Sequence, residues 1–207
     1  MTTIEAYDTE GFYDEIVMAP GKPRAGMEVL ADRLNFMNRA DLLQRQAVAE
    51  QILYHMGITF NVYGDDGGAE RIFPFDVIPR IITAKEWAWI EKGLIQRTYA
   101  LNLFLQDIYN EKKILRDGVI PRHVIESSAG YRRECIGLTP PRGVWCHISG
   151  TDLVRDKDGQ IYVLEDNLRC PSGVSYVLEN REVMKRSFPQ VFDVGRVRSV
   201  EAYPSQL

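Results

Sequence analysis

Features of export, membrane insertion and disulfide scaffolding are scarce in this sequence. It has three cysteines, Cys135, Cys146 and Cys170, an odd number without a C-x-x-C pair, which favours a reducing compartment over a disulfide framework. No run of 18 apolar residues occurs, and the N-terminus, MTTIEAYDTEGFYDE, is acidic and lacks the apolar core of a signal peptide. We therefore expect a cytoplasmic protein with neither an export signal nor a membrane span.

Excess positive charge and internal repetition are also missing. The net charge is −4, and the lysines and arginines are scattered along the chain. Nucleic acid is therefore not expected as a partner, because such proteins carry a basic footprint. The three histidines have no zinc-type partner at short spacing, so we interpret them as structural.

What is present is an ordinary globular composition, with 45% hydrophobic and 26% charged residues in 207, enough to bury a sizeable core. Apolar residues at three- and four-residue steps predict helices over 27–37 and 42–56, the second ending at Gly57. ITFNVY and RIFPFDVIPRII predict a hairpin around the turn GDDGGA, with the returning strand broken by two prolines.

The clearest helix is expected over 83–112. Thr83 and Glu86 have the T-x-x-E spacing of a capping box. An apolar stripe follows on one face, which we interpret as core packing and not as a cofactor site: Trp87, Ile90, Leu94, Leu101, Phe104, Leu105 and Ile108. Residues 116–143 are rich in turn formers.

A second hairpin is predicted from VWCHISGTDLVR and QIYVLEDN, joined by DKDG, whose Gly159 can adopt a positive φ. If Arg155 faces Gln160, Asp152 faces Val163. The two-residue period of a strand then places three polar side chains on one face, and a slip of one residue would separate them: Asp152, Glu165 and Asn167.

Two carboxylates and an amide carbonyl supply only hard oxygen donors. Such a set suits Mg²⁺ better than Zn²⁺ and leaves positions for phosphate oxygens. A helix is predicted to begin near Ser172 and Gly173, where unpaired N–H groups favour an anion. Arg169 and Arg181 could bind the same anion through two hydrogen bonds. The alternative is a solvated acidic turn, an ordinary serine cap and surface arginines.

The segment GTDLVRDKDGQIYVLEDNLRCPSGVSYVLENR resembles the metal-binding segment of the ATP-grasp superfamily, in which an Asp on one strand and E-x-N on the next hold Mg²⁺. More narrowly, the chain resembles the circularly permuted ATP-grasp proteins described as glutathionylspermidine-synthase-like. ERIFPFDVIPRII and EWAWIEKGLIQRTYALNLFLQDIY share this resemblance, which covers roughly residues 10–200. By position, the resemblance implies Asp152, Glu165 and Asn167 as metal ligands.

The resemblance also implies an activity: ATP-dependent, ADP-forming ligation of a carboxylate to an amine through an acyl phosphate, with Mg²⁺ as cofactor and small molecules or peptides as substrates. Arg169 and Arg181 would then be catalytic, and Ser172 and Gly173 would bind substrate. No protein nucleophile is needed, so Cys170 is expected to be a packing or rim residue.

For the fold we expect α/β of the α+β kind: a single partial ATP-grasp-like domain over 1–207, with helices around a mainly antiparallel sheet that carries the metal-binding hairpin. Its parts are N-terminal helices and hairpin (1–82), a long helix and loops (83–142), and the metal hairpin and helix (143–207). The chain differs from the family pattern in one respect: no glycine-rich segment for the nucleotide follows its metal-binding segment. We therefore expect another chain or domain to complete the nucleotide site. The competing hypothesis is a catalytically incomplete fragment, or a non-catalytic module that docks a partner protein.

Overall fold

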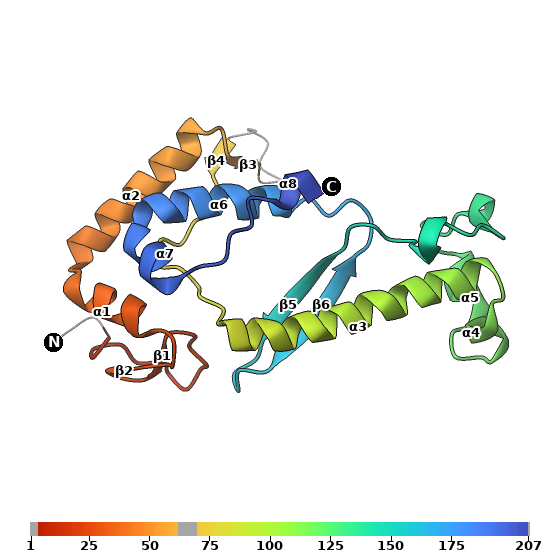
Figure 1. Cartoon of the computed structure of the whole chain (residues 1–207), viewed down its shortest axis with the longest axis horizontal. Coiled ribbons are helices and arrows are strands. Elements are labelled where there is room, and N and C mark those ends of the chain that lie inside the picture. The colour runs from red at the N-terminus through yellow and green to blue at the C-terminus, as the bar shows by residue number, and fades with distance from the viewer. Residues whose placement is uncertain (1–3, 62–69, 207) are drawn as a thin grey trace. The chain divides into compact units, whose positions relative to one another are not determined.

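The computed structural model describes residues 4–61 and 70–206 (Figure 1). The chain divides into two compact units. Unit 1 contains residues 1–83, 154–162 and 172–207, and unit 2 contains residues 84–153 and 163–171. Neither unit is one continuous stretch of sequence, because the chain passes from one to the other at 83/84, 153/154, 162/163 and 171/172.

Unit 1 is built mainly from helices. Their bounds are α1 Glu28–Phe36, α2 Arg39–His55, α6 Val174–Ser187, α7 Pro189–Gly195 and α8 Tyr203–Gln206. The two predicted N-terminal helices are confirmed, and Gly57 follows α2 with a φ of +71°. Asn38 and Asp41 begin α2 with a capping box, in which each side chain accepts from the other residue's backbone N–H.

The core of unit 1 joins segments that are far apart in sequence. One cluster combines Leu30 and Leu34 of α1 with Phe188 and Val191 around α7. A second cluster brings Leu53 of α2 against α6, and these two helices lie side by side (Figure 1). The C-terminal helices α6 and α7 therefore complete the hydrophobic core that α1 and α2 begin.

The strands of the N-terminal half are short. β1 Val17–Ala19 pairs with β2 Lys22–Pro23, and β3 Thr59–Asn61 pairs antiparallel with β4 Glu70–Ile72. The predicted hairpin is thus present, but the returning strand ends before Pro74, as expected of a residue without a backbone N–H. The predicted turn at 64–69 lies outside the described residues.

Unit 2 is organised around one long helix, α3 Ala84–Tyr109, which confirms the predicted helix. The turn-rich region that follows forms α4 Lys113–Arg116, α5 Arg122–Glu126 and two 3-10 turns, η1 Arg133–Cys135 and η2 Pro141–Gly143. At the end of α3 the Tyr109 ring stacks on both Tyr131 and Trp145, with centroids 5.1 and 4.9 Å away. These rings fix the loop region to α3.

The second predicted hairpin is formed by β5 Gly150–Arg155 and β6 Ile161–Asn167. In its loop the Asp156 N–H donates to the Gln160 carbonyl at 2.9 Å. Gly159 has a φ of +83°, as predicted. The first strand is shorter than expected, because the backbone N–H groups of Trp145 and Cys146 donate to the Asn102 side chain of α3 rather than to a strand.

The expectation of one mainly antiparallel sheet was wrong. The described strands form three separate two-stranded sheets, since the N-terminal strands have only two or three residues. The fold is a mixture of helices and small antiparallel sheets, of the α+β kind. Among the described residues no helix combines the length and apolar character required to span a bilayer.

Candidate functional site

The end of the β5–β6 hairpin gathers polar side chains of unit 2. The Asn167 amide donates to Glu165 Oε1 at 3.1 Å, so these two side chains lie on the same face of β6. Gly150, at the start of β5, is the cross-strand neighbour of Asn167: a Cβ on this glycine would lie 3.8 Å from the Asn167 Cβ. The E-x-N pair is thus assembled beside the first residue of β5.

The position of Asp152 follows from this pairing. Side chains two residues apart on a strand lie on the same face. Asp152 is two residues after Gly150, and Glu165 is two residues before Asn167. A regular ladder therefore puts Asp152 opposite Glu165, closer than the diagonal relation that a Val163 partner would give. Asp152 and Glu165 are exposed and Asn167 is half-buried, so this face is open to a ligand.

The residue between the E-x-N pair points the other way. Asp166 accepts from Arg97 Nε of α3 at 2.6 Å and from the Thr151 hydroxyl at 3.0 Å. Its side chain is only 8% exposed. This ion pair anchors the opposite face of the hairpin to α3 and separates the structural carboxylate from the two that remain available.

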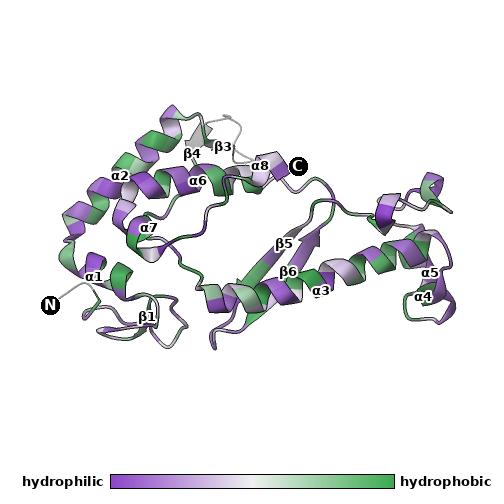
Figure 2. Cartoon of the chain, in the orientation of Figure 1, coloured by the Kyte–Doolittle hydropathy of each residue, from purple (hydrophilic) through white to green (hydrophobic). Residues whose placement is uncertain are grey.

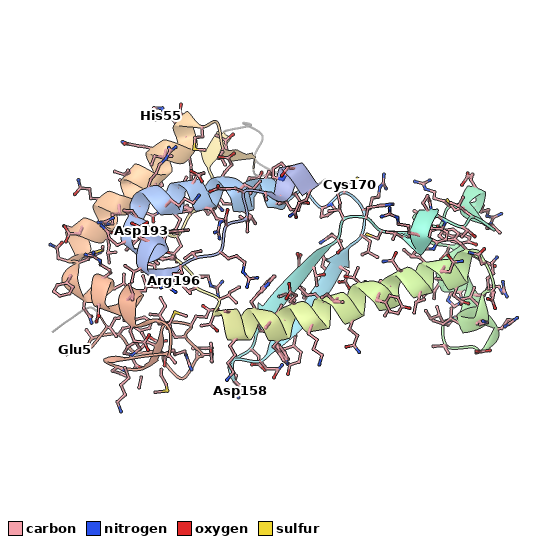
Figure 3. All side chains as sticks on the ribbon, in the orientation of Figure 1. Glu5, His55, Asp158, Cys170, Asp193 and Arg196 are labelled. Carbon is pink, nitrogen blue, oxygen red and sulfur yellow. The ribbon has the colours of Figure 1, made fainter. Side chains whose placement is uncertain are left out.

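The chain bends at Arg169 directly after β6, and this turn leads to Pro171. Leu168 and Cys170 lie between Asn167 and Pro171, and Cys170 has a left-handed φ of 49° with an exposed side chain (Figure 3). The Pro171 ring lies where a side chain at Gly150 would be, since an added Cβ would come 2.8 Å from the Pro171 Cβ. Only glycine fits there, so the close approach fixes the turn beside the E-x-N pair.

The other predicted residues lie at different places. Arg169 is exposed on the same turn of unit 2. Ser172 and Gly173 begin the α6 segment of unit 1, where Gly173 is the N-cap and no side chain caps the helix. Arg181 is engaged within unit 1: its Nη2 donates to the Arg198 carbonyl at 2.5 Å, and its guanidinium lies over the Phe192 ring.

The side chains on this face of the hairpin offer oxygen atoms, the ligand type that hard divalent cations prefer. Two carboxylates and one amide oxygen suit Mg²⁺. Among residues 4–61 and 70–206, no group of three or more histidines, cysteines and acids is placed to hold a metal. A metal here would therefore depend on the amide of Asn167 and on oxygens that the ligand brings.

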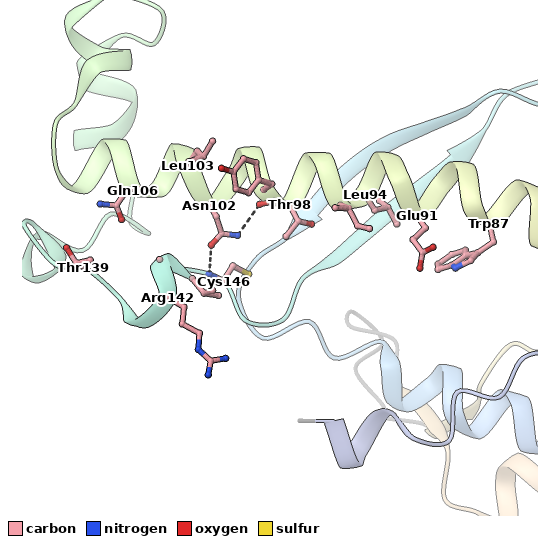
Figure 4. A pocket seen from close by; sticks show the side chains of 14 residues that line it. Trp87, Glu91, Leu94, Thr98, Asn102, Leu103, Gln106, Thr139, Arg142 and Cys146 are labelled. Carbon is pink, nitrogen blue, oxygen red and sulfur yellow. Dashed lines mark hydrogen bonds between the residues drawn. The ribbon is translucent and has the colours of Figure 1, made fainter.

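A groove of about 780 Å³ runs along α3 in the same unit (Figure 4). One wall is α3, and the other is the segment from Thr139 to Cys146. Asn102 joins the walls by accepting from the N–H groups of Trp145 and Cys146 at 2.7 and 3.2 Å. The Cys146 Sγ lies 3.1 Å from the Ile148 carbonyl oxygen and 3.3 Å from the Leu168 carbonyl oxygen, so this end of the groove adjoins the turn after Asn167.

Sequence reasoning missed this groove and the Arg97–Asp166 pair. The signal for the groove was a second apolar series on α3, at Ile95, Tyr99 and Leu103. The stripe interpreted as core was only partly that: Ile90 and Ile108 are buried, whereas Trp87 and Leu94 line the groove. The ion pair had no signal, because Arg97 and Asp166 are 69 residues apart.

Comparisons with known proteins place this chain in a family. Residues 79–207 match the family described as circularly permuted ATP-grasp type 2. An uncharacterized protein of Synechocystis sp. is 52% identical over 204 residues, which are 99% of this chain and 42% of that protein. An uncharacterized protein of Mycobacterium tuberculosis is 45% identical over 203 residues, 98% of this chain and 34% of that protein.

A third relative carries a descriptive name. The putative glutamate–cysteine ligase 2-3 of Frankia alni is 39% identical over 189 residues, which cover 91% of this chain and 21% of that protein. The chain thus spans less than half the length of each of these relatives. Since the matched region contains both strands of the hairpin and the whole of α6, the chain belongs to the circularly permuted ATP-grasp type 2 family.

Proposed function

We propose that this chain carries the Mg²⁺-binding half of an ATP-dependent, ADP-forming ligase that joins a carboxylate to an amine. The observation that carries the proposal is the contact between Glu165 and Asn167 on one face of β6, in a segment that matches the ATP-grasp family. The name of the Frankia alni relative describes a ligase of two amino acids. It supports amino acids or peptides as substrates. The narrower glutathionylspermidine-synthase-like specificity remains a prediction.

Asp152, Glu165 and Asn167 would hold the ion through their oxygens. A bound Mg²⁺ would neutralise charge on the ATP phosphates and orient them. The two carboxylates lie on an exposed face, which gives the phosphates access from solvent. Asp166, fixed by Arg97, would keep the hairpin in place as charge accumulates in front of it.

The proposed chemistry has two steps. A carboxylate oxygen of the substrate forms a bond to the γ-phosphorus as the bond to ADP breaks. The amine nitrogen then attacks the acyl carbon, phosphate leaves, and the nitrogen loses a proton. Arg169, exposed on the turn after β6, can bind anionic oxygens that develop there. Arg181 is the weaker candidate, because it already donates to Arg198.

Ser172 and Gly173 precede α6, a helix of 14 residues whose first N–H groups have no side-chain cap. Such N–H groups bind carboxylate or phosphate oxygens. We therefore propose this helix start as the place for the substrate carboxylate.

Metal binding tests the proposal on the chain as it stands. With Mn²⁺ as a spectroscopic substitute for Mg²⁺, we expect binding by the unmodified chain and a loss of at least about tenfold in the Asp152→Asn/Glu165→Gln variant. The matched control, Glu134→Gln/Asp158→Asn, removes the same charge at exposed positions and should bind like the parent. Equal weakening in both variants would mean that only net charge matters, and the metal site would be wrong.

Turnover tests the ligase assignment. The chain is joined to the remainder of the Synechocystis relative, and ADP release is measured with the twenty amino acids as carboxylates and hydroxylamine as amine. Release should require a carboxylate and should disappear in the Asp152→Asn/Glu165→Gln variant. If the protein binds a partner but never releases ADP, the non-catalytic docking module is the better interpretation.

A further inference from the structure

A long helix with little buried surface is the starting point. Among its 26 residues α3 fully buries only Ile90, Ile108 and Tyr109. We use the name α3 apolar face for Ile95, Tyr99 and Leu103, whose side chains are 66%, 66% and 52% exposed. Their four-residue spacing puts them in one row on the helix surface, and Figure 2 shows the hydrophobic residues distributed along α3.

This row is part of a larger hollow. All three residues line the groove of about 780 Å³ that the segment Thr139 to Cys146 closes on its other side (Figure 4). At 1.5 Å per residue the row extends about 12 Å along the helix. Exposed apolar residues that gather along a groove mark a surface that another polypeptide or a ligand covers.

The relatives indicate where such polypeptide comes from. The matched region is 42% of the Synechocystis protein and 34% of the Mycobacterium tuberculosis protein. More than half of each relative therefore lies outside the part that corresponds to this chain. A compact fold of that length must bury apolar surface between its parts.

We propose that polypeptide equivalent to the remainder of these relatives packs an apolar element on the α3 apolar face and into the groove. This inference rests on the proposed function only in that the same remainder would complete the nucleotide site. Because Cys146 Sγ, at one end of the groove, lies 3.3 Å from the carbonyl oxygen of Leu168 beside Asn167, the docked element would reach the end of the E-x-N strand.

The test compares the 207-residue chain with a chimera in which it replaces the matched region of the Synechocystis protein. Hydroxyl-radical oxidation of Tyr99 measures coverage directly. Covering the Tyr99 ring from 66% exposed to the 7% of the buried Tyr109 should slow its oxidation roughly ninefold, the ratio of the two exposed fractions. Fast oxidation in the isolated chain together with slow oxidation in the chimera is the expected result.

A pair of variants supplies the control. Ile95→Glu/Leu103→Glu should lower the melting temperature of the chimera while leaving that of the isolated chain unchanged. Val119→Glu/Val124→Glu adds the same charge at apolar positions of unit 2 that are 70% and 49% exposed and do not line the groove, and should affect neither protein. If the chimera does not fold, the two pieces are expressed together, and co-purification must be lost only with Ile95→Glu/Leu103→Glu.

Two results would overturn the inference. If Tyr99 is already slow to oxidise in the isolated chain, a second copy or another part of the same chain covers it. If Tyr99 reacts equally fast in both proteins, nothing packs there. ADP release is a separate readout: a chimera that turns over with an uncovered Tyr99 would retain the proposed function and refute the docking.

Discussion

Successive side chains of β6 lie on opposite faces of the strand, and this alternation divides Glu165, Asp166 and Asn167 into two roles. Glu165 and Asn167 contact each other on one face, whereas Asp166 points to the other and pairs with Arg97. The Asp166 carboxylate accepts one hydrogen bond on each oxygen, from the arginine at 2.6 Å and from the Thr151 hydroxyl at 3.0 Å, and these bonds hold it on the α3 side of the hairpin. Sequence alone shows two acids in a row, and only the period of the strand tells which one is free for a ligand.

Among the glycines that the structure describes, Gly159 has the shortest contact with an added methyl group. Its φ is +83°, and an added Cβ would lie 2.3 Å from the Tyr13 ring. For Gly159→Ala we expect about 1–2 kcal/mol of left-handed backbone strain and about 1–3 kcal/mol more from overpacking. Thermal unfolding measures the sum.

Gly118→Ala separates the two contributions. Gly118 has a similar φ of +71° but no atom within 4 Å of the added Cβ, so only the backbone strain remains. Equal destabilisation by the two substitutions would show that the Tyr13 ring moves aside at no cost.

At the scale of elements, the C-terminal segment is held to α6 by charge. Lys185 Nζ lies 2.8 Å from Glu182 Oε1 and also pairs with Glu201. The hydrogen bond from Lys185 and its charge hold the pKa of Glu201 below the ordinary glutamate value of 4.5. Hydrogen bonds to Glu182 and Glu201 raise the pKa of Lys185 above its ordinary 10.5.

The sign of the pH dependence follows from these directions. The lowered pKa of Glu201 stabilises the folded state above pH 4.5, and this contribution is lost as the pH falls through the lowered value. The raised pKa of Lys185 stabilises it below pH 10.5, and this is lost as the pH rises through the raised value. The effect is small because both groups are solvated.

A carbon-13 titration of the Glu201 carboxyl checks this prediction. Its midpoint should lie below 4.5 and rise in the Lys185→Met variant. Lys157→Met, which removes a lysine from the β5–β6 loop, should leave the midpoint unchanged. If the titration midpoint of Glu201 is the same in both variants as in the unmodified chain, the ion pair between Lys185 and Glu201 is contradicted.

The elements show how far the sequence could be interpreted. The presence of the helices was predictable because apolar spacing is a local signal, and so was the hairpin loop at Gly159. The start of α2 was predicted three residues too late, at 42 rather than at Arg39, because the capping box of Asn38 and Asp41 was missed. The start of β5 was not predictable, since Trp145 and Cys146 bind Asn102 of α3, a distant partner. For the candidate site, the predicted register was wrong by two residues: it put Val163 opposite Asp152, whereas Gly150 lies beside Asn167. A shift of two residues keeps each side chain on its face, so the predicted grouping on one face is unchanged.

At the scale of the whole molecule, the core of unit 1 depends on its last segment. Val183, Phe188 and Val191 belong to the clusters that hold α1 and α2. Removing residues 172–207 should therefore expose both clusters, at a cost that exceeds the 3–5 kcal/mol of a single phenylalanine deletion. Hydrogen exchange should show that α2 loses protection while α3, in unit 2, retains it.

A shorter truncation is the control. Deleting residues 197–207 removes α8, which has no buried residue, and leaves α6 and α7 intact. Protection of α2 should persist in that variant. If α2 stays protected even without residues 172–207, the two N-terminal helices are stable by themselves and the core assignment is wrong.

The interrupted course of unit 1 has a consequence during synthesis. Residues 1–83 leave the ribosome first, but Val183 follows 100 positions after Thr83. At 5–20 residues per second this is a delay of about 5–20 s. Throughout that interval the apolar faces of α1 and α2 can pack only on neighbours such as Val17 and Val77, and the surface that α6 and α7 later cover stays exposed. Such transient apolar surface makes a nascent chain prone to aggregation until its final helices emerge.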